Sequence, residues 1–341
     1  MPVPSLPFEL INFIFSYLVS PISLAPPSFY RDLCSAALVC RNWTAPAQSL
    51  LWEQVCLSKG DKQIEKWLGV DHKAGLWVKA LVLVKGRDEQ GLRAKYTTEV
   101  LLRLFARCGG ISSLNCDLWL RDVCEAVPDF VRWFFPNLRS FGVAYSYRQY
   151  GQQQSPALPL GIRTLLVRGQ PVQNMWGLSY AAYLALEIAK DYEAGRFPLL
   201  NRVEVADLAA LPPLQTLAPA LRTLVLPRVQ LAAAASRADL SAFLAVCSNL
   251  TRLVIPLLWD ASLVEAVPPS LTHLEVGTVT GGAFRAFCVD FERLARSWTS
   301  VVELRIQDLR NDERLQDTME LWEQVEESCA SRGIEVVMSG R

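Results

Sequence analysis

Two patterns of hydrophobic residues divide the chain. Between residues 6 and 52 the apolar residues recur at helical spacing, whereas from residue 78 onward they recur as L-x-x-L-x-L, which places alternate side chains on one face of a strand. The first pattern predicts a small helical domain at residues 1–56. The second predicts strands that alternate with helices at residues 57–341. We therefore expect an α/β protein in two parts.

The first predicted helix, which ends near Leu18, carries two apolar stripes. One stripe consists of Leu6, Leu10, Ile14 and Leu18, and the other consists of Phe8, Ile11 and Phe15. Helical geometry turns the two stripes roughly 100° from one another. Because one stripe is enough to pack against its own domain, the second predicts contact with another protein.

Two more helices are predicted after a loop. Prolines exclude a continuous helix across residues 19–30, and helical spacing resumes at Arg31 and again at Asn42, ending near Trp52. A polar hinge is expected at residues 58–62. Taken one at a time, Leu38, Cys40 and Trp43 are expected to pack in the core of this helical bundle.

The strand pattern recurs in units of 21 to 38 residues. Its middle apolar residues are Leu81, Leu114, Phe141, Leu165, Val203, Leu224, Leu253, Leu274 and Leu304. A further short strand is predicted at Ile334, Val336 and Met338. Units of this length, in which each unit buries its apolar face on the next, are typical of a solenoid.

The N-terminal residues resemble an F-box, and the repeats resemble degenerate leucine-rich repeats. The F-box resemblance rests on Leu6-Pro7-x-Glu9-Leu10, then Ile14 and Leu18, then Leu38-Val39-Cys40-x-x-Trp43, and it covers roughly the first fifty residues. The loop at residues 19–30 is longer than the connection usual in that family. The fold expected from both resemblances is a three-helix F-box followed by an irregular leucine-rich-repeat solenoid.

The F-box resemblance implies a partner, the Skp-type adaptor, and through it the cullin scaffold of a cullin-RING ubiquitin ligase. The chain would then be the substrate receptor of an SCF-type ligase, without a cofactor or a catalytic site of its own. The adaptor-binding residues that it implies are Leu6, Pro7, Phe8, Glu9, Leu10, Ile11, Ile14, Phe15, Leu18, Leu38, Val39, Cys40 and Trp43.

The repeats depart from the leucine-rich-repeat pattern at one position. In that family an Asn or Cys usually follows the last strand leucine by three residues and satisfies backbone groups of the loop. In the later copies this position holds Leu208, Val229, Leu258, Val279 and Leu309. Hydrogen bonds to the loop backbone must therefore come from elsewhere, and we expect an irregular arc.

Strand alternation places the residues beside the core leucines on the opposite face of the sheet. We hypothesise that a protein substrate binds there, on Arg168, Arg202, Glu204, Arg252, His273, Glu275 and Arg305. An ordinary solvated sheet face accounts for the same residues equally well, since any sheet exposed to water needs polar side chains.

Composition narrows the classes of partner. Lys+Arg and Asp+Glu both total 34, so no basic excess predicts nucleic-acid binding. No apolar run approaches the roughly 20 residues that span a bilayer, so we expect a soluble protein without a membrane partner. None of the 9 cysteines lies in a C-x-x-C pair, which is typical of an intracellular protein, in the cytoplasm and/or the nucleus.

Catalytic and metal-binding patterns are weak. The chain has only 2 histidines, His72 and His273, and no spacing of His and Cys predicts a metal site. Gly177-Leu178-Ser179-Tyr180-Ala181 is the nearest approach to a nucleophile elbow, but it lacks the second glycine. Two alternatives to the substrate receptor stay open: an adaptor-binding or scaffold solenoid without a role in ubiquitination, and a hydrolase.

Overall fold

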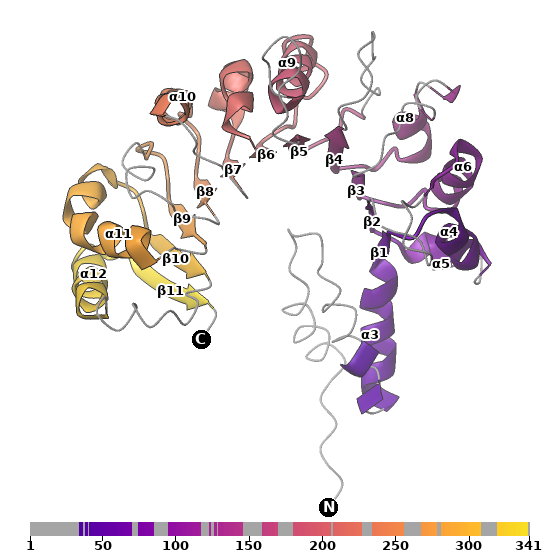
Figure 1. Ribbon diagram of the computed structural model, residues 1–341, viewed down its shortest axis with the longest axis horizontal. Helices are drawn as coiled ribbons and strands as arrows, with labels where there is room; N and C mark the ends of the chain where they lie inside the picture. The colour runs from indigo at the N-terminus through magenta and orange to yellow at the C-terminus, as the bar shows by residue number, and fades with distance from the viewer. Residues whose placement is uncertain are drawn as a thin grey trace, which may run out of the picture. The chain divides into compact units, whose positions relative to one another are not determined.

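The structure is a computed structural model, shown in Figure 1. It describes residues 34–36, 38–39, 41–69, 74–84, 95–116, 123, 126–127, 129–145, 159–169, 180–205, 207–226, 234–255, 267–277, 281–307 and 319–339. The chain divides into two compact units, residues 1–143 with 151–161 and residues 144–150 with 162–341. These described ranges hold eleven strands, and every strand pairing within them is parallel.

The first unit begins, within the described ranges, with helical residues that lead directly into a strand. Its elements are α3 (Arg41–Glu53), β1 (Gln54–Leu57), α4 (Asp61–Leu68), α5 (Ala74–Trp77), β2 (Ala80–Leu83), α6 (Thr98–Arg107), β3 (Ser113–Cys116), α8 (Phe130–Phe134) and β4 (Ser140–Tyr145), which starts in this unit. The strands pair in chain order, so each parallel neighbour is reached by one crossover connection.

The second unit repeats the same arrangement with longer helices. It contains β5 (Thr164–Gly169), α9 (Tyr180–Glu193), β6 (Arg202–Val205), β7 (Thr223–Val225), α10 (Ala234–Val246), β8 (Arg252–Ile255), β9 (His273–Val276), α11 (Gly281–Leu294), the 3₁₀ turn η5 (Ala295–Ser297), β10 (Glu303–Gln307), α12 (Met319–Ser331) and β11 (Glu335–Ser339). The helices of this unit lie on one side of its strands, which follow a curved path (Figure 1).

A row of apolar side chains in register forms the core of the second unit. Val203, Leu224, Leu253, Leu274 and Leu304 are direct partners across adjacent strands, and none is more than 1% exposed. Burying a side chain of this size contributes about 1.5–3 kcal/mol relative to leaving it in water. The L-x-x-L-x-L prediction of alternating strands and helices is therefore confirmed.

Three features at the start of the sheet differ from the prediction. The sequence did not predict β1, whose Val55 and Leu57 are buried, because a four-residue run gives only one alternation. The boundary predicted between residues 56 and 57 falls inside this strand. The expected polar hinge at residues 58–62 is also shorter than predicted, since α4 begins at Asp61.

Between β6 and β7 the expected α-helix is wrong. Three 3₁₀ turns take its place: η1 (Leu208–Ala210), η2 (Pro212–Thr216) and η3 (Ala218–Ala220). Prolines at 212, 213 and 219 cannot donate the backbone hydrogen bonds that a continuous helix needs. Leu208, which stands where leucine-rich repeats usually have Asn or Cys, is 3% exposed and therefore packs in the core.

Backbone carbonyls at the strand starts supply hydrogen bonds that link successive repeats. The Asn201 carbonyl accepts from the N–H groups of Arg222 and Thr223, at 2.7 and 3.0 Å. The carbonyls that accept from two consecutive N–H groups in this way belong to Lys79, Ser112, Arg163, Asn201, Arg222, Thr251 and Thr272. The hydroxyl of Thr251 also donates to the Arg222 carbonyl at 3.1 Å. The other residues that stand where leucine-rich repeats usually have Asn or Cys lie outside the described residues; they are Val229, Leu258, Val279 and Leu309.

Gly75 allows α5 to pack closely against the end of α6. A Cβ atom at this buried position would lie 2.4 Å from the Arg107 carbonyl oxygen and 2.6 Å from Arg107 Cγ. Both distances are shorter than any van der Waals contact, and the carbonyl belongs to the backbone. Only glycine therefore fits between the two helices without displacing one of them.

We predict that Gly75→Ala lowers the free energy of unfolding by about 1–3 kcal/mol, because the methyl group forces α5 and α6 apart. Gly110→Ala is the matched control, since its Cβ would lie 3.6 Å from the nearest atom, the Leu76 carbonyl oxygen. That variant is expected to change stability by less than about 0.5 kcal/mol. Urea unfolding followed by tryptophan fluorescence measures both, and equal stability of the two variants would contradict the packing argument.

Candidate functional site

Two of the predicted adaptor-binding residues are exposed apolar side chains. Leu38 is 87% exposed and Val39 is 64% exposed, whereas Trp43 near the start of α3 is half-buried. The expectation that Leu38 packs in a helical core is therefore wrong for the described structure. Adjacent exposed Leu and Val side chains are characteristic of a surface that another protein covers.

The remaining predicted adaptor-binding residues cannot be placed. Leu6, Pro7, Phe8, Glu9, Leu10, Ile11, Ile14, Phe15, Leu18 and Cys40 lie outside the described residues. The same holds for residues 19–30, where the long loop is predicted, and for Gly177 to Ser179 of the potential nucleophile elbow. The apolar surface of the first helix stays a prediction.

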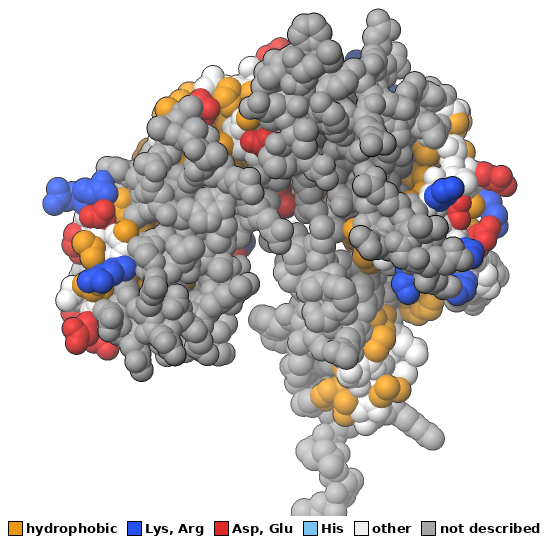
Figure 2. Space-filling model, viewed as in Figure 1, with side chains coloured by type: hydrophobic (Ala, Val, Ile, Leu, Met, Phe, Trp, Pro, Cys, Tyr) orange, Lys and Arg blue, Asp and Glu red, His pale blue; other side chains and the backbone are white. Residues whose placement is uncertain are grey.

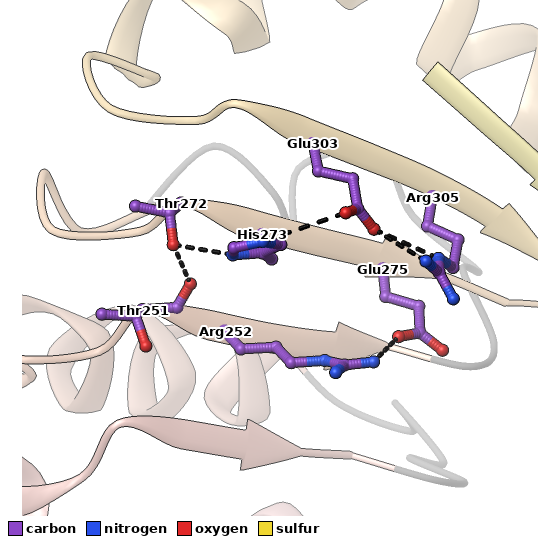
Figure 3. Close-up of polar contacts among 7 residues, drawn as sticks. All are labelled: Thr251, Arg252, Thr272, His273, Glu275, Glu303 and Arg305. Carbon is purple, nitrogen blue, oxygen red and sulfur yellow. Dashed lines mark hydrogen bonds and ion pairs between the residues drawn. The ribbon is translucent and has the colours of Figure 1, made fainter. Parts of the chain in front are cut away.

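On the face of the second unit opposite the leucine row, charged residues of neighbouring strands pair with one another (Figure 3). Arg252 on β8 donates from Nη2 to Oε2 of Glu275 on β9 at 2.5 Å. Glu275 is only 7% exposed, whereas the Arg252 side chain is 40% exposed. The carboxylate therefore lies beneath the cation, and the guanidinium is the member that solvent reaches.

A second group of contacts involves β9 and β10. On β10, Arg305 donates from Nε and Nη2 to Oε1 of Glu303, at 3.2 and 3.1 Å. His273 on β9 directs Nε2 toward Glu303 Oε2 at 3.8 Å, as the dashed line in Figure 3 shows. The Thr272 hydroxyl donates to the Thr251 carbonyl at 2.9 Å, so it accepts from His273 Nδ1 at 2.8 Å. The imidazole is thereby fixed in orientation.

Arg202 and Glu204 continue the charged face onto β6. Glu204 is 3% exposed and Arg202 is half-buried. Burial lowers the pKa of the Arg202 guanidinium; the nearby charges of Glu204 and Glu275 raise it, and that of Arg252 lowers it. The seventh predicted residue, Arg168, lies in β5, but its side chain is outside the described residues.

On the charged face the carboxylates are less exposed than the side chains that pair with them. Arg252, His273 and Arg305 have side chains 40%, 46% and 38% exposed, while the carboxylates of Glu275 and Glu303 are 9% and 23% exposed. An arrangement of this kind can offer guanidinium N–H groups to acidic or carbonyl oxygens of a partner.

Three further residues take part in this face. Glu303, which strand alternation also places on the outward row, accepts from Arg305 and faces His273, and the hydroxyls of Thr251 and Thr272 fix the strand starts. Arg252, His273 and Glu303 occupy the same position before the core leucine of their strands. The strand pattern therefore predicts the place of Glu303, whereas it does not predict the hydrogen bonds of the two threonines.

Cysteine thiols in the core are held in their protonated form. Burial raises the pKa of Cys108, Cys247 and Cys288 to about 12, so they are not nucleophilic thiolates at neutral pH. Within the described ranges, no three His, Cys, Asp or Glu side chains are close enough together to hold a metal ion. No described helix is both long and apolar enough to cross a membrane.

We predict that Arg252→Ala lowers the free energy of unfolding by about 1–3 kcal/mol, because the buried Glu275 carboxylate loses a charged donor. The double variant Arg252→Met with Glu275→Gln is expected to recover most of this loss, since it removes the buried charge as well. Arg293→Ala is the control: its pair with Asp290 is exposed on both sides and is worth less than about 1 kcal/mol. Urea unfolding that gives the same loss for Arg252→Ala and Arg293→Ala would contradict this reading of the face.

Comparison with known protein families agrees with the N-terminal pattern. Residues 3–58 match the F-box-like family. A search of curated proteins finds no match to the chain. The matched range includes Leu38, Val39 and all of α3, and it ends just after β1. An F-box-like domain is a module that binds Skp-type adaptors and is typically non-catalytic. This chain is therefore a protein with an F-box-like domain at its N-terminus, followed by a long all-parallel sheet of the leucine-rich-repeat type.

Proposed function

We propose that this protein is the substrate-recognition subunit of an SCF-type ubiquitin ligase, acting inside the cell in the cytoplasm and/or the nucleus. The F-box-like domain binds the Skp-type adaptor and through it the cullin scaffold, and the charged face of the parallel sheet binds a target protein. The observation that carries the proposal is the F-box-like match at residues 3–58. Other subunits transfer ubiquitin, and this chain contributes proximity and orientation.

The exposure of Leu38 and Val39 supports adaptor binding. Both residues lie inside the F-box-like range, and both side chains are exposed to solvent. Covering them with a partner removes apolar surface from water at about 25 cal/mol per Å². Leu38 and Val39 therefore provide the exposed apolar surface that an adaptor interface needs.

The layered charges of β8–β10 support target binding. Their exposed members, Arg252, His273 and Arg305, come from three adjacent strands and are held in place by carboxylates or hydroxyls. Side chains that are already fixed lose little conformational entropy when a partner binds. A target with acidic or carbonyl oxygens on its surface fits this face.

A second function is favoured by one observation, the internal pairing of these same charges. A face whose arginines already bind its own carboxylates needs no partner, and such a protein would hold the adaptor as a scaffold without presenting a target. The two functions differ in whether changes to the charged face alter the set of bound proteins.

We predict that replacing Leu38 and Val39 with Asp raises the Kd for a purified Skp-type adaptor at least about tenfold, equivalent to about 1.4 kcal/mol. Leu6→Ala with Pro7→Ala and Ile14→Ala is expected to have a similar effect. Val289→Asp, on α11 at 63% exposure, is the control and is expected to bind like the wild type. Calorimetry measures the affinities, and circular dichroism checks folding. An unchanged Kd in all of these folded variants would contradict the adaptor proposal.

We predict that the variant with His273→Ala and Arg305→Ala loses target proteins while it keeps the adaptor, because two of the three exposed side chains of the face are gone and Arg252, which pairs with the buried Glu275, is kept. The control carries Arg285→Ala and Arg296→Ala, two exposed cations on α11 and η5. Quantitative mass spectrometry of proteins that co-purify with each form compares the two. If wild type and both variants retain the same proteins, the scaffold function is favoured instead.

A further inference from the structure

The short helix α5 presents two adjacent apolar side chains to water. Leu76 is 72% exposed and Trp77 is 57% exposed, although the residues on either side of them, Gly75 and Val78, are buried. Large apolar side chains in contact with one another on a surface are characteristic of an interaction site. Neither residue lies in the F-box-like range, which ends at residue 58.

The backbone holds these two side chains in place. Gly75 packs against the Arg107 carbonyl so closely that no side chain fits there, and Val78 is 0% exposed. The Lys79 N–H donates to the Glu53 carbonyl at 2.8 Å, which ties the segment to the end of α3. Because Leu76 and Trp77 lie between fixed points, binding a partner costs them little backbone entropy.

The exposed end of α5 continues the apolar surface of the F-box-like domain. Helix α3 starts two residues after Val39, contacts α5, and is about 20 Å long at 1.5 Å per residue. Its side chains at Leu50, Leu51 and Trp52 are half-buried. Figure 2 shows hydrophobic side chains on the visible side of α3. Helix α3 and its half-buried apolar side chains therefore connect the region of Leu38 to α5 within the first unit.

We propose that Leu76 and Trp77 form a second contact for the same Skp-type adaptor that binds the F-box-like domain. This inference rests on the proposed function and assigns α5, outside the matched range, to the adaptor interface. Continuity with the adaptor-binding surface selects this occupant over a target protein, for which the charged face of the second unit is available. An ion pair at the junction, Lys79 Nζ to Glu53 Oε1 at 2.6 Å, fixes α5 on α3 so that one partner can cover both.

The test uses the full-length chain and purified Skp-type adaptor in calorimetry. Leu76→Ser with Trp77→Ser is expected to raise the Kd about fivefold or more, whereas Trp133→Ser is expected to leave it unchanged. Trp133 is the matched control because it is an equally large side chain, 73% exposed, on α8 of the same unit. If the wild type binds the adaptor and both variants bind it with the same Kd as the wild type, the α5 contact is overturned while the proposed function stands. If the wild type itself fails to bind, the proposed function fails, and the inference with it.

Hydrogen exchange gives a measurement that needs no variant. Adding the adaptor to the wild type is expected to slow amide exchange at residues 74–79 as well as at residues 38–53. Slowed exchange at residues 38–53 alone would overturn the inference. Light scattering tests whether a second copy of this chain covers α5 instead. If the isolated wild type is a dimer and the Leu76→Ser with Trp77→Ser variant is a monomer, a second copy covers α5 and the inference is wrong.

Discussion

The structure depends on one constraint, that a strand of three to six residues cannot bury its own leucines. Each core leucine is covered only because the next strand lies in register beside it, as Leu253 lies between Leu224 and Leu274. The carbonyls at the strand starts enforce that register by accepting two N–H groups from the following repeat. Hydrophobic burial and backbone hydrogen bonding therefore act on the same residues, and each repeat stabilises its neighbour.

The opposite face of the sheet is free from this constraint, which is why it can carry charge. Even so, Glu204 and Glu275 are almost completely buried there, and a buried carboxylate needs a charged donor close by. Arg252 meets that need for Glu275 and still leaves part of its guanidinium in water. The same side chain thus contributes to stability and still leaves donor groups in water, so deleting this single arginine would test stability and the proposed binding at the same time.

Most of the sheet could be predicted from the sequence because the L-x-x-L-x-L pattern reports directly on which residues are covered. The strand β1 was missed because two buried residues, Val55 and Leu57, are too few to establish a period. The 3₁₀ turns η1 to η3 depart from the general alternation of strands and helices because prolines interrupt this connection.

The candidate sites were less predictable than the fold. Alternation indicates which face a residue occupies, but the depth of Glu275 and the exposure of Leu38 depend on neighbours that are distant in sequence. The two residues that distinguish α5, Leu76 and Trp77, belong to a helix of four residues and have no pattern of their own. Their exposure, and the contact between Gly75 and Arg107 beside them, are seen only in the folded chain.

The direct passage from α3 into β1 determines what kind of connection joins this helix to the sheet. Glu53 ends the helix and Gln54 begins the strand, and Glu53 is also bonded through its backbone and its side chain to Lys79. No flexible linker separates the two elements. Helix α3 and strand β1 therefore move together, so a protein that bound α3 would be held at a fixed angle to the first strand.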